Sequence, residues 1–348
     1  MLDYQHKNHA DGGKYLSAFD MINKLKPLKN DGEHDWLYEV SNTSLQDTCR
    51  DLDKAYKSFF NKSSGFPAFK SRKHSKAMYP IRSDALWFDG KYANVEKVGK
   101  VKYKTDFDLP HGTHSGKYYN ARISYDGFKW YLSFTMECEN QAPELTDKSM
   151  GIDLGIKELV VVAYGDEELV FPNINKSRPM RELEKRIKHL QRSISRKYEH
   201  NRVGNKYIKT NNIIREEKRL KKLLKRQKDI RHNYVHQTTH KLASMLPKRV
   251  VIEDLNVTGM MKNKHLSKAI QGQCFFEFKR QMAYKCEWNG IELIEADRFY
   301  PSSKTCSCCG AVKHDLKLRD RIFTCPGCGL EIDRDYNAAI NLMNYFPA

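Results

Sequence analysis

The spacing of apolar residues predicts a helix in the first part of the chain. Residues 1–40 are polar and weakly patterned, but from Ser41 to about Asn61 apolar residues recur at intervals of four and three, which places them on one helical face. They are Leu45, Cys49, Leu52, Tyr56 and Phe59. The Ser63-Ser64-Gly65 run then breaks the pattern, and we predict a helical segment over 1–79.

Strand-like patterns predict β structure in the next region. The stretches 118–125 and 128–136 both look like strands, and Asp126-Gly127 between them is a strong signal for a two-residue hairpin. We therefore predict a small antiparallel sheet or barrel over 80–147, with its last residues, 140–147, acting as a linker.

The second half of the chain mixes strands with helices, which predicts the α/β fold class. Gly151–Ile156 and Leu159–Ala163 have the pattern of two strands joined by a tight turn, and Arg249–Ile252 that of a short buried strand. The other elements expected here are a helix over 267–288, a strand over 291–294 and a last helix over 335–344. The predicted domain boundaries in this half are 148–303, 304–330 and 331–348.

Positive charge is concentrated on a predicted helical hairpin. The chain has 61 lysines and arginines against 43 aspartates and glutamates, a formal net charge of +18. Two long helices separated by 201–212 form the hairpin over 178–246, and 21 basic but only 6 acidic residues lie between Lys176 and Arg231. This excess is too one-sided for i,i+4 salt bridging, so we predict contact with a phosphate backbone. A solvated charged face and a coiled coil are the alternatives.

Candidate nucleic-acid contacts come from this hairpin and from the loop Phe66–Lys73, in which aromatic and basic residues alternate. The alternative for the loop is a solvated segment anchored by its two phenylalanines. The candidates are Lys70, Arg72 and Lys73 in the loop and Arg186, Arg192, Arg196, Lys222 and Arg226 in the hairpin.

Four cysteines form two pairs with the spacing of a zinc site. Cys306-x2-Cys309 and Cys325-x2-Cys328 are separated by 15 residues, and a glycine follows each pair. Four thiolates hold Zn²⁺ tetrahedrally and leave no position open, so we expect a structural zinc, with Cys308 as a minor alternative ligand. A disulfide framework is disfavoured because no signal-peptide pattern is present. With no membrane-spanning run either, we expect a cytoplasmic protein.

Three carboxylates lie at the boundaries of predicted elements. Asp153 is in a strand just before the Leu154-Gly155 turn, Glu253 ends the strand 249–252, and Asp335 begins the last helix. Two-metal phosphodiester hydrolysis needs several carboxylates on rigid elements, holding Mg²⁺ or Mn²⁺ on both sides of the phosphate. The alternatives are a turn-forming aspartate at the first position and a plain helix N-terminal acid at the last.

Together these motifs resemble the TnpB (OrfB) family, which is encoded by bacterial insertion sequences and is similar to type V CRISPR effectors. The resemblance covers about Ser41 to Asn344 and is strongest from Met150 onwards. The motifs that carry it are Gly151-Ile152-Asp153-Leu154-Gly155, Ile252-Glu253-Asp254-Leu255-Asn256, Ser302 to Gly310, Cys325-Pro326-Gly327-Cys328-Gly329 and Asp333 to Ala339.

The resemblance implies an RNase-H-like (RuvC) nuclease domain with a helical insertion and a zinc ribbon, which cuts DNA chosen by a guide RNA. Asp153, Glu253 and Asp335 would then be the ligands of Mg²⁺ (or Mn²⁺), with Asp333 as the rival for the third place. Because pairing with the guide would read the target DNA, the protein would need mainly backbone contacts.

The family pattern also implies a difference at the start of this chain. Relatives usually begin with an extra strand that belongs to the RNA-holding, wedge-like barrel, and residues 1–40 do not supply it. We therefore expect a chain shortened by a few tens of residues, with 80–147 as the remainder of that barrel and guide binding impaired.

Three other functions stay open from the sequence. One is a guide-dependent DNA-binding protein without cleavage, against which the retained carboxylates argue. The second is a transposase or transposase accessory protein, although no His-x-His motif accompanies a tyrosine as a tyrosine-type enzyme would need. The third is an N-terminally degraded, inactive remnant.

Overall fold

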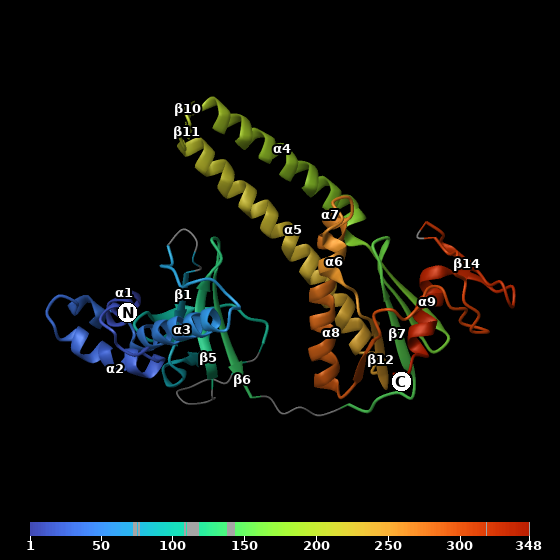
Figure 1. The fold of residues 1–348 in the computed structure, drawn as a ribbon, viewed down its shortest axis with the longest axis horizontal. Coiled ribbons are helices and arrows are strands. Elements are labelled where there is room, and N and C mark those ends of the chain that lie inside the picture. The colour runs from blue at the N-terminus through green and yellow to red at the C-terminus, as the bar shows by residue number, and fades with distance from the viewer. Residues whose placement is uncertain are drawn as a thin grey trace. The chain divides into compact units, whose positions relative to one another are not determined.

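The structure, a computed structural model, describes residues 1–71, 75, 77–107, 109, 118–137, 143–317 and 319–347. The chain divides into two compact units, Met1–Glu139 and Asn140–Ala348 (Figure 1). The first residues of the predicted linker, 140–142, lie outside the described part. No helix among the described residues is long and apolar enough to cross a membrane.

Helices form the first part of unit one, as α1 (Leu2–Ala10), α2 (Ala18–Lys29), the 3₁₀ turn η1 (Asp35–Tyr38) and α3 (Asn42–Phe60). The last of these confirms the helix predicted from Ser41, which is its N-cap. The helices α1 and α2 lie within residues 1–40, where the apolar pattern did not predict a particular helix or strand. α2 starts with a capping box, in which Ser17 and Asp20 bond to each other's backbone N–H.

Two three-stranded antiparallel sheets follow the helices in the described part of unit one and confirm the predicted β region. One has the order β1-β5-β6 and the other β2-β3-β4, with the short η2 (Ser83–Ala85) between β1 and β2. Phe88 and Tyr118 are buried together in their common core. The strands are β1 (Ala77–Pro80), β2 (Trp87–Asp89), β3 (Tyr92–Val95), β4 (Gly99–Lys102), β5 (Tyr118–Tyr125) and β6 (Trp130–Met136).

A five-stranded mixed sheet in the order β13-β12-β7-β8-β9 is the centre of unit two. β7, β8 and β9 form an antiparallel meander, whereas β12 and β13 run parallel to β7. The strand β9 is absent from the sequence prediction. The bounds are β7 (Ser149–Leu154), β8 (Glu158–Tyr164), β9 (Glu167–Pro172), β12 (Arg249–Glu253) and β13 (Glu292–Ala296).

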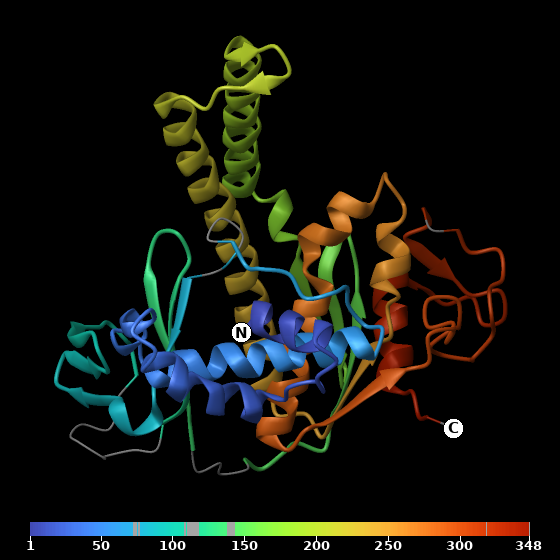
Figure 2. The same ribbon diagram turned by 60° about the vertical axis from the view of Figure 1, so that its left-hand side comes forward.

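The predicted αα-hairpin is confirmed and projects away from this sheet (Figure 2). It consists of α4 (Arg178–His200), which follows η3 (Ile174–Lys176), and α5 (Asn211–Ala243). A small β-ribbon, β10 (Arg202–Val203) with β11 (Lys206–Tyr207), joins them at the tip.

Between β12 and β13 the chain forms α6 (Val257–Met261), α7 (Ser267–Gln273) and α8 (Phe275–Asn289). The prediction of one helix over 267–288 is wrong. Cys274 has a left-handed backbone with φ of 57°, which interrupts the helical hydrogen bonding and separates α7 from α8.

Helices cover the two faces of the sheet differently (Figure 1). Met150 and Ile152 point to the face covered by α5 and α8, where Leu242 and Phe278 are fully buried. The opposite face is covered by α9 (Arg334–Met343) alone among the described helices. The hairpin of β14 (Ile322–Thr324) and β15 (Glu331–Asp333) leads directly into α9.

A glycine in β7 sets how closely α9 approaches the sheet. A Cβ added to Gly151 would fall well inside van der Waals contact with the backbone of Ala339 and Met343, for example 2.9 Å from the Met343 Cα. Backbone cannot move aside as a flexible side chain can. Only glycine therefore allows the last helix to lie directly on the strand that carries Asp153.

We expect Gly151→Ala to push α9 from the sheet and lower the free energy of unfolding by about 1–3 kcal/mol, the usual cost of overpacking. The matched control is Gly65→Ala, where a Cβ meets nothing within 4 Å. Urea unfolding of both variants measures the difference. Equal stability of the two variants would contradict this packing role.

Candidate functional site

Asp153 and Glu253 lie on neighbouring parallel strands at the same edge of the sheet. In the pairing of β7 with β12, Ile152 lies opposite Ile252, so the next residue on each strand is one of the two carboxylates. Because side chains alternate between the faces of a strand, both carboxylates point to the same face as Gly151. That is the face covered by α9.

The first turn of α9 adds Asp335 to this face. Asp335 lies one helical turn before Ala339 and two before Met343, the residues that contact β7, so all three share one stripe of the helix. Its Oδ1 accepts hydrogen bonds of 2.8 and 3.1 Å from the Arg334 guanidinium, and Arg321 lies 3.5 Å away. The Asp335 side chain is only 13% exposed.

Asp333, the rival candidate, has a different position. It is the exposed N-cap of α9, and its Oδ1 accepts hydrogen bonds from the backbone N–H groups of Asp335 and Tyr336 at 2.9 and 3.2 Å. Its carboxylate thus satisfies orphan donors at the start of the helix.

The electrostatics of the site reflect several acids in one confined place. Burial raises the pKa of Asp153 well above its usual range, and the nearby charges of Glu253 and Asp335 raise it further. Burial also raises the pKa of Glu253, and the Ser302 hydroxyl, 3.5 Å from its Oε1, lowers it again in part. Arg334 offsets only part of this negative charge.

These carboxylates are more widely spread than the ligands of one tightly bound ion. Among the described residues, only the cysteine cluster brings three or more ligand atoms within 4.8 Å of one another. Two ions about 3.5–4 Å apart need ligands spread around both of them. The donor set fits Mg²⁺ or Mn²⁺, because it consists of carboxylate oxygens. A bound cation would favour the ionised forms of Asp153 and Glu253, whose pKa values burial raises.

Metal binding at this place should strengthen as pH rises through the raised pKa of Asp153, because ions bind the deprotonated carboxylates. Without metal, rising pH has the opposite effect and lowers the stability of the folded protein. A carboxyl with a raised folded-state pKa holds its proton more tightly in the folded state, so its contribution to stability is lost as pH rises through that pKa. Thermal melts with and without Mg²⁺, from about pH 4 to about pH 8, measure both effects. Stabilisation by Mg²⁺ that does not change with pH would contradict this account.

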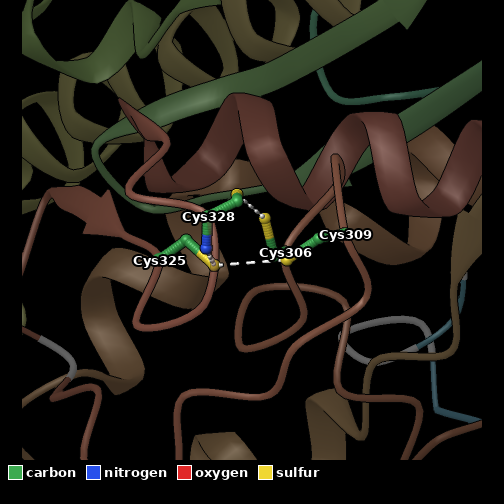
Figure 3. A group of neighbouring side chains, drawn as sticks. All are labelled: Cys306, Cys309, Cys325 and Cys328. Carbon is green, nitrogen blue, oxygen red and sulfur yellow. Dashed lines mark hydrogen bonds between the residues drawn. The ribbon is translucent and has the colours of Figure 1, made fainter.

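The four predicted cysteines converge on one point (Figure 3). All four Sγ atoms lie within 4.8 Å of one another, with Cys306 and Cys328 3.7 Å apart and Cys309 and Cys325 3.5 Å apart. Exposed Cys308 is not part of this group. The cluster has the composition and compactness of a zinc site.

Two matching backbone turns build the cluster. Gly310 and Gly329, each directly after a cysteine pair, both have φ of 75°, a left-handed conformation that favours glycine. In the second turn the Sγ of Cys325 accepts the backbone N–H groups of Gly327 and Cys328 at 3.3 and 3.4 Å. The N–H of Cys328 and then that of Gly327 lower the pKa of the Cys325 thiol to about 6, which favours the thiolate that a metal needs.

One groove between α4 and α5 on the hairpin gathers several cations. It has a volume of about 650 Å³ and is lined by Lys185, Arg186, His189, Arg219 and Lys222 together with two leucines. None of the described acidic residues lines it, whereas Lys197 and Lys209 elsewhere on the hairpin form ion pairs with Glu216 and Glu217. The groove is therefore a site of unbalanced positive charge.

The predicted nucleic-acid contacts are only partly brought together. Arg186 and Lys222 line the groove, whereas Arg192, Arg196 and Arg226 are exposed on the hairpin outside it. Lys70 is exposed in unit one and lies 3.5 Å from Asp51. Arg72 and Lys73 lie outside the described residues. Sequence reasoning missed Lys185, His189 and Arg219, although the spacing of three residues from Arg186 to His189 and from Arg219 to Lys222 was a usable signal.

The sequence did not predict three buried polar residues, two on α9 and one beside Glu253. Asn337 is fully buried and Asn341 is 6% exposed on α9, and Ser302 is buried beside Glu253. Two asparagines four residues apart in the otherwise apolar stretch 336–343 are the signal that was available, since a buried amide needs hydrogen-bond partners.

Comparisons with known proteins indicate the family of this chain. Residues 133–264 match a family described as "Probable transposase" and residues 275–342 match the "Cas12f1-like, TNB domain". A protein of Streptomyces pristinaespiralis named "Putative RNA-guided DNA endonuclease" is 32% identical over 92% of this chain and 75% of its own length. Its counterpart InsQ from Escherichia coli K12 is 29% identical over 98% of this chain and 84% of its own length.

The fold is shared with a solved nucleoprotein complex. The protein in the "Cryo-EM structure of the Cas12f1-sgRNA-target DNA complex" superposes with a TM-score of 0.60 at 15% identity, covering 98% of this chain and 78% of that one. The class is thus a mixed α/β protein with the Cas12f fold and a four-cysteine cluster. Within this class, the chain belongs to the TnpB (OrfB) family.

Proposed function

We propose that this chain is an RNA-guided DNA endonuclease associated with a bacterial transposable element, with a RuvC-like centre formed by Asp153, Glu253 and Asp335. The observation that carries the proposal is that these acids come from three separate elements, β7, β12 and α9, and share one face at one edge of the sheet. The names of the relatives support the same activity.

In this mechanism the three carboxylates would hold two Mg²⁺ or Mn²⁺ ions, which supply a water nucleophile and neutralise charge on the scissile phosphate. The chain's own residues provide the rigid frame. β7 and β12 fix Asp153 and Glu253 through backbone pairing, and the close packing of α9 on Gly151 fixes Asp335. Arg334 holds the Asp335 carboxylate in one orientation. We propose Asp335 rather than Asp333 as the third ligand, because Asp333 is occupied as the helix cap.

We propose that the four cysteines bind a structural Zn²⁺ and that the protein works in the reducing cytoplasm, where thiolates stay available to the metal. We also propose the boundaries 1–79, 80–147, 148–303, 304–330 and 331–348 as functional segments, with the first two holding the guide RNA.

We propose that the groove between α4 and α5 binds the phosphate backbone of the guide RNA or target DNA. Replacing Arg186 and Lys222 with glutamine should weaken binding at low salt and reduce the slope of log affinity against log salt by roughly 0.7–0.9 per lost phosphate contact. Lys197→Gln, which removes a cation already paired with Glu216, is the matched control. An unchanged salt slope in the double variant would contradict this role for the groove.

The function is tested by purifying the chain with its retained nucleic acid, sequencing any RNA, and offering DNA that matches it. We expect a defined RNA and cutting of the matching DNA in Mg²⁺. Retention of a defined RNA with binding but no cutting would instead support a guide-dependent DNA-binding protein. Absence of any bound RNA would contradict guidance.

A further inference from the structure

We infer that Asn337 and Asn341 are positioning residues that tie the geometry of the carboxylates to the metal-bound state of the cysteine cluster. The inference rests on the proposed nuclease function for its activity measurement, although its structural part can be tested without cleavage. The helix α9 has two faces, one carrying Asp335 against the sheet and the other carrying the two asparagines.

The two asparagines lie on the side of α9 that does not face the sheet. At about 100° per residue, Asn337 and Asn341 point away from the stripe of Asp335, Ala339 and Met343. Such positions on a helix that covers a sheet are normally exposed to solvent. Here Asn337 is fully buried and Asn341 is 6% exposed, because the segment 302–307 covers that side.

Asn337 makes one hydrogen bond on each side of a cluster cysteine. Its Nδ2 donates to the Thr305 carbonyl at 2.7 Å, and its Oδ1 accepts the backbone N–H of Ser307 at 3.0 Å. The residue between them is Cys306. The amide therefore fixes the backbone of a cysteine whose position a bound metal would also fix.

Asn341 extends the same network towards the carboxylates. Its Nδ2 donates to the carbonyls of Ser302 and Thr305, both at 2.7 Å. The hydroxyl of Ser302 lies 3.5 Å from Oε1 of Glu253. One chain of contacts thus runs from Glu253 through Ser302 and α9 to the first cysteine turn.

The cluster is also connected to α9 through the backbone. The second cysteine turn leads into β15, whose last residue, Asp333, is the N-cap of α9, two positions before Asp335. The N–H of Arg334 donates to the Arg321 carbonyl at 2.8 Å. A ten-residue helix is marginal on its own, so these contacts and the sheet must set its position.

If the cysteine turns lose their metal, the backbone around Cys306 is free to move, and the anchors of α9 move with it. Asp335 would then shift relative to Asp153 and Glu253, whose backbone positions are held by strand pairing in the sheet. The cluster would therefore control the metal affinity of the carboxylates as well as the stability of its own turns.

Asn337→Ala tests this coupling, with Asn344→Ala, an exposed residue at the end of the same helix, as matched control. We expect Asn337→Ala to keep about one zinc per chain by elemental analysis. It should cut matching DNA about 10–100-fold more slowly and need more Mg²⁺ for half-maximal rate. Substitutions of residues that support metal ligands, without binding the metal themselves, have effects of this size. Asn344→Ala should behave as the wild type.

Hydrogen exchange gives a readout that does not require cleavage. Removing zinc from the wild type with a chelator should speed exchange in α9, while Asn337→Ala should show fast exchange in α9 even with zinc bound. The inference would be overturned if Asn337→Ala matched the wild type in hydrogen exchange of α9, in Mg²⁺ requirement and in cleavage rate. Loss of zinc by that variant would also overturn it. If the wild type does not cleave, the proposed function fails, but the exchange comparison still decides the coupling.

Discussion

Asp153→Asn is expected to abolish DNA cleavage while leaving nucleic-acid binding intact. The rate should fall at least about 100-fold, since even residues one step removed from metal ligands cost 10–100-fold when changed. Asparagine has nearly the same shape as aspartate but lacks the charge that a divalent cation requires. Cleavage of matching DNA and a separate binding assay measure the two effects.

The control for this variant is Asp166→Asn, an exposed position in the turn between β8 and β9 of the same sheet. It removes one negative charge near the sheet without touching the three acids. Equal loss of cleavage in both variants would assign the effect to net charge rather than to a metal ligand.

The same substitution should stabilise the metal-free protein at neutral pH. Burial and the charges of Glu253 and Asp335 raise the pKa of Asp153, so its ionised form is unfavourable in the folded state above that pKa. The asparagine side chain carries no such charge. We therefore expect a higher melting temperature without metal and a smaller gain on adding Mg²⁺ than in the wild type. A lower melting temperature for metal-free Asp153→Asn would contradict the idea that excess negative charge at these acids destabilises the folded protein.

The second large effect is expected for Cys325→Ser, which should lose the bound zinc and unfold the segment around the cysteine turns. Structural zinc sites are worth about 10–16 kcal/mol in isolated fingers at neutral pH, and a hydroxyl is a poor replacement for a thiolate. Cys325 is buried, and its Sγ accepts two backbone N–H groups, which hold the thiolate in place for the metal. A serine hydroxyl at this position supplies no thiolate. Elemental analysis and limited proteolysis measure the outcome.

Cys308→Ser is the matched control, because this exposed cysteine lies between two cluster residues but outside the group. It should keep about one zinc per chain and the wild-type digestion pattern. Zinc loss in Cys308→Ser, or retention in Cys325→Ser, would show that the cluster uses other ligands.

The sequence predicted the strand ends that carry Asp153 and Glu253 because each follows a short apolar run at an abrupt change to polar residues. It could not show that the two strands are neighbours in parallel register, since β7 and β12 are separated by about a hundred residues that include the hairpin, and they pair only in the folded sheet. The prediction that the three acids form one site came from the family resemblance and not from the periodicity of apolar residues.

The elements that sequence reasoning missed have identifiable physical causes. β9 is an edge strand whose residues are half-exposed or exposed. Its apolar run, Leu169-Val170-Phe171, is shorter than the roughly four to eight residues that mark a buried strand. α2 begins with the Ser17 and Asp20 capping box, a polar signal that apolar periodicity does not detect. The break at Cys274 depends on one backbone conformation that no residue type requires.

Within the site, long-range contacts were the least predictable. The pairing of Asn337 with residues on both sides of Cys306 joins parts of the chain about thirty positions apart, and nothing local in the sequence indicates it. The selection of basic residues that line the groove likewise depends on how α4 and α5 pack, since it leaves out Arg192 and Arg196. The spacing of residues along each helix taken separately could not show which basic residues line the groove.

We propose that Asp153, Glu253 and Asp335 form the metal-dependent centre of an RNA-guided nuclease. The most direct test is Mg²⁺-dependent cutting by the chain with its retained RNA, using DNA that matches that RNA and a scrambled DNA. We predict that the wild type cuts only the matching DNA, that chelation of Mg²⁺ stops cutting, and that Asp153→Asn binds the DNA without cutting it. Cutting by Asp153→Asn at the wild-type rate, or equal cutting of both DNAs, would contradict this proposal.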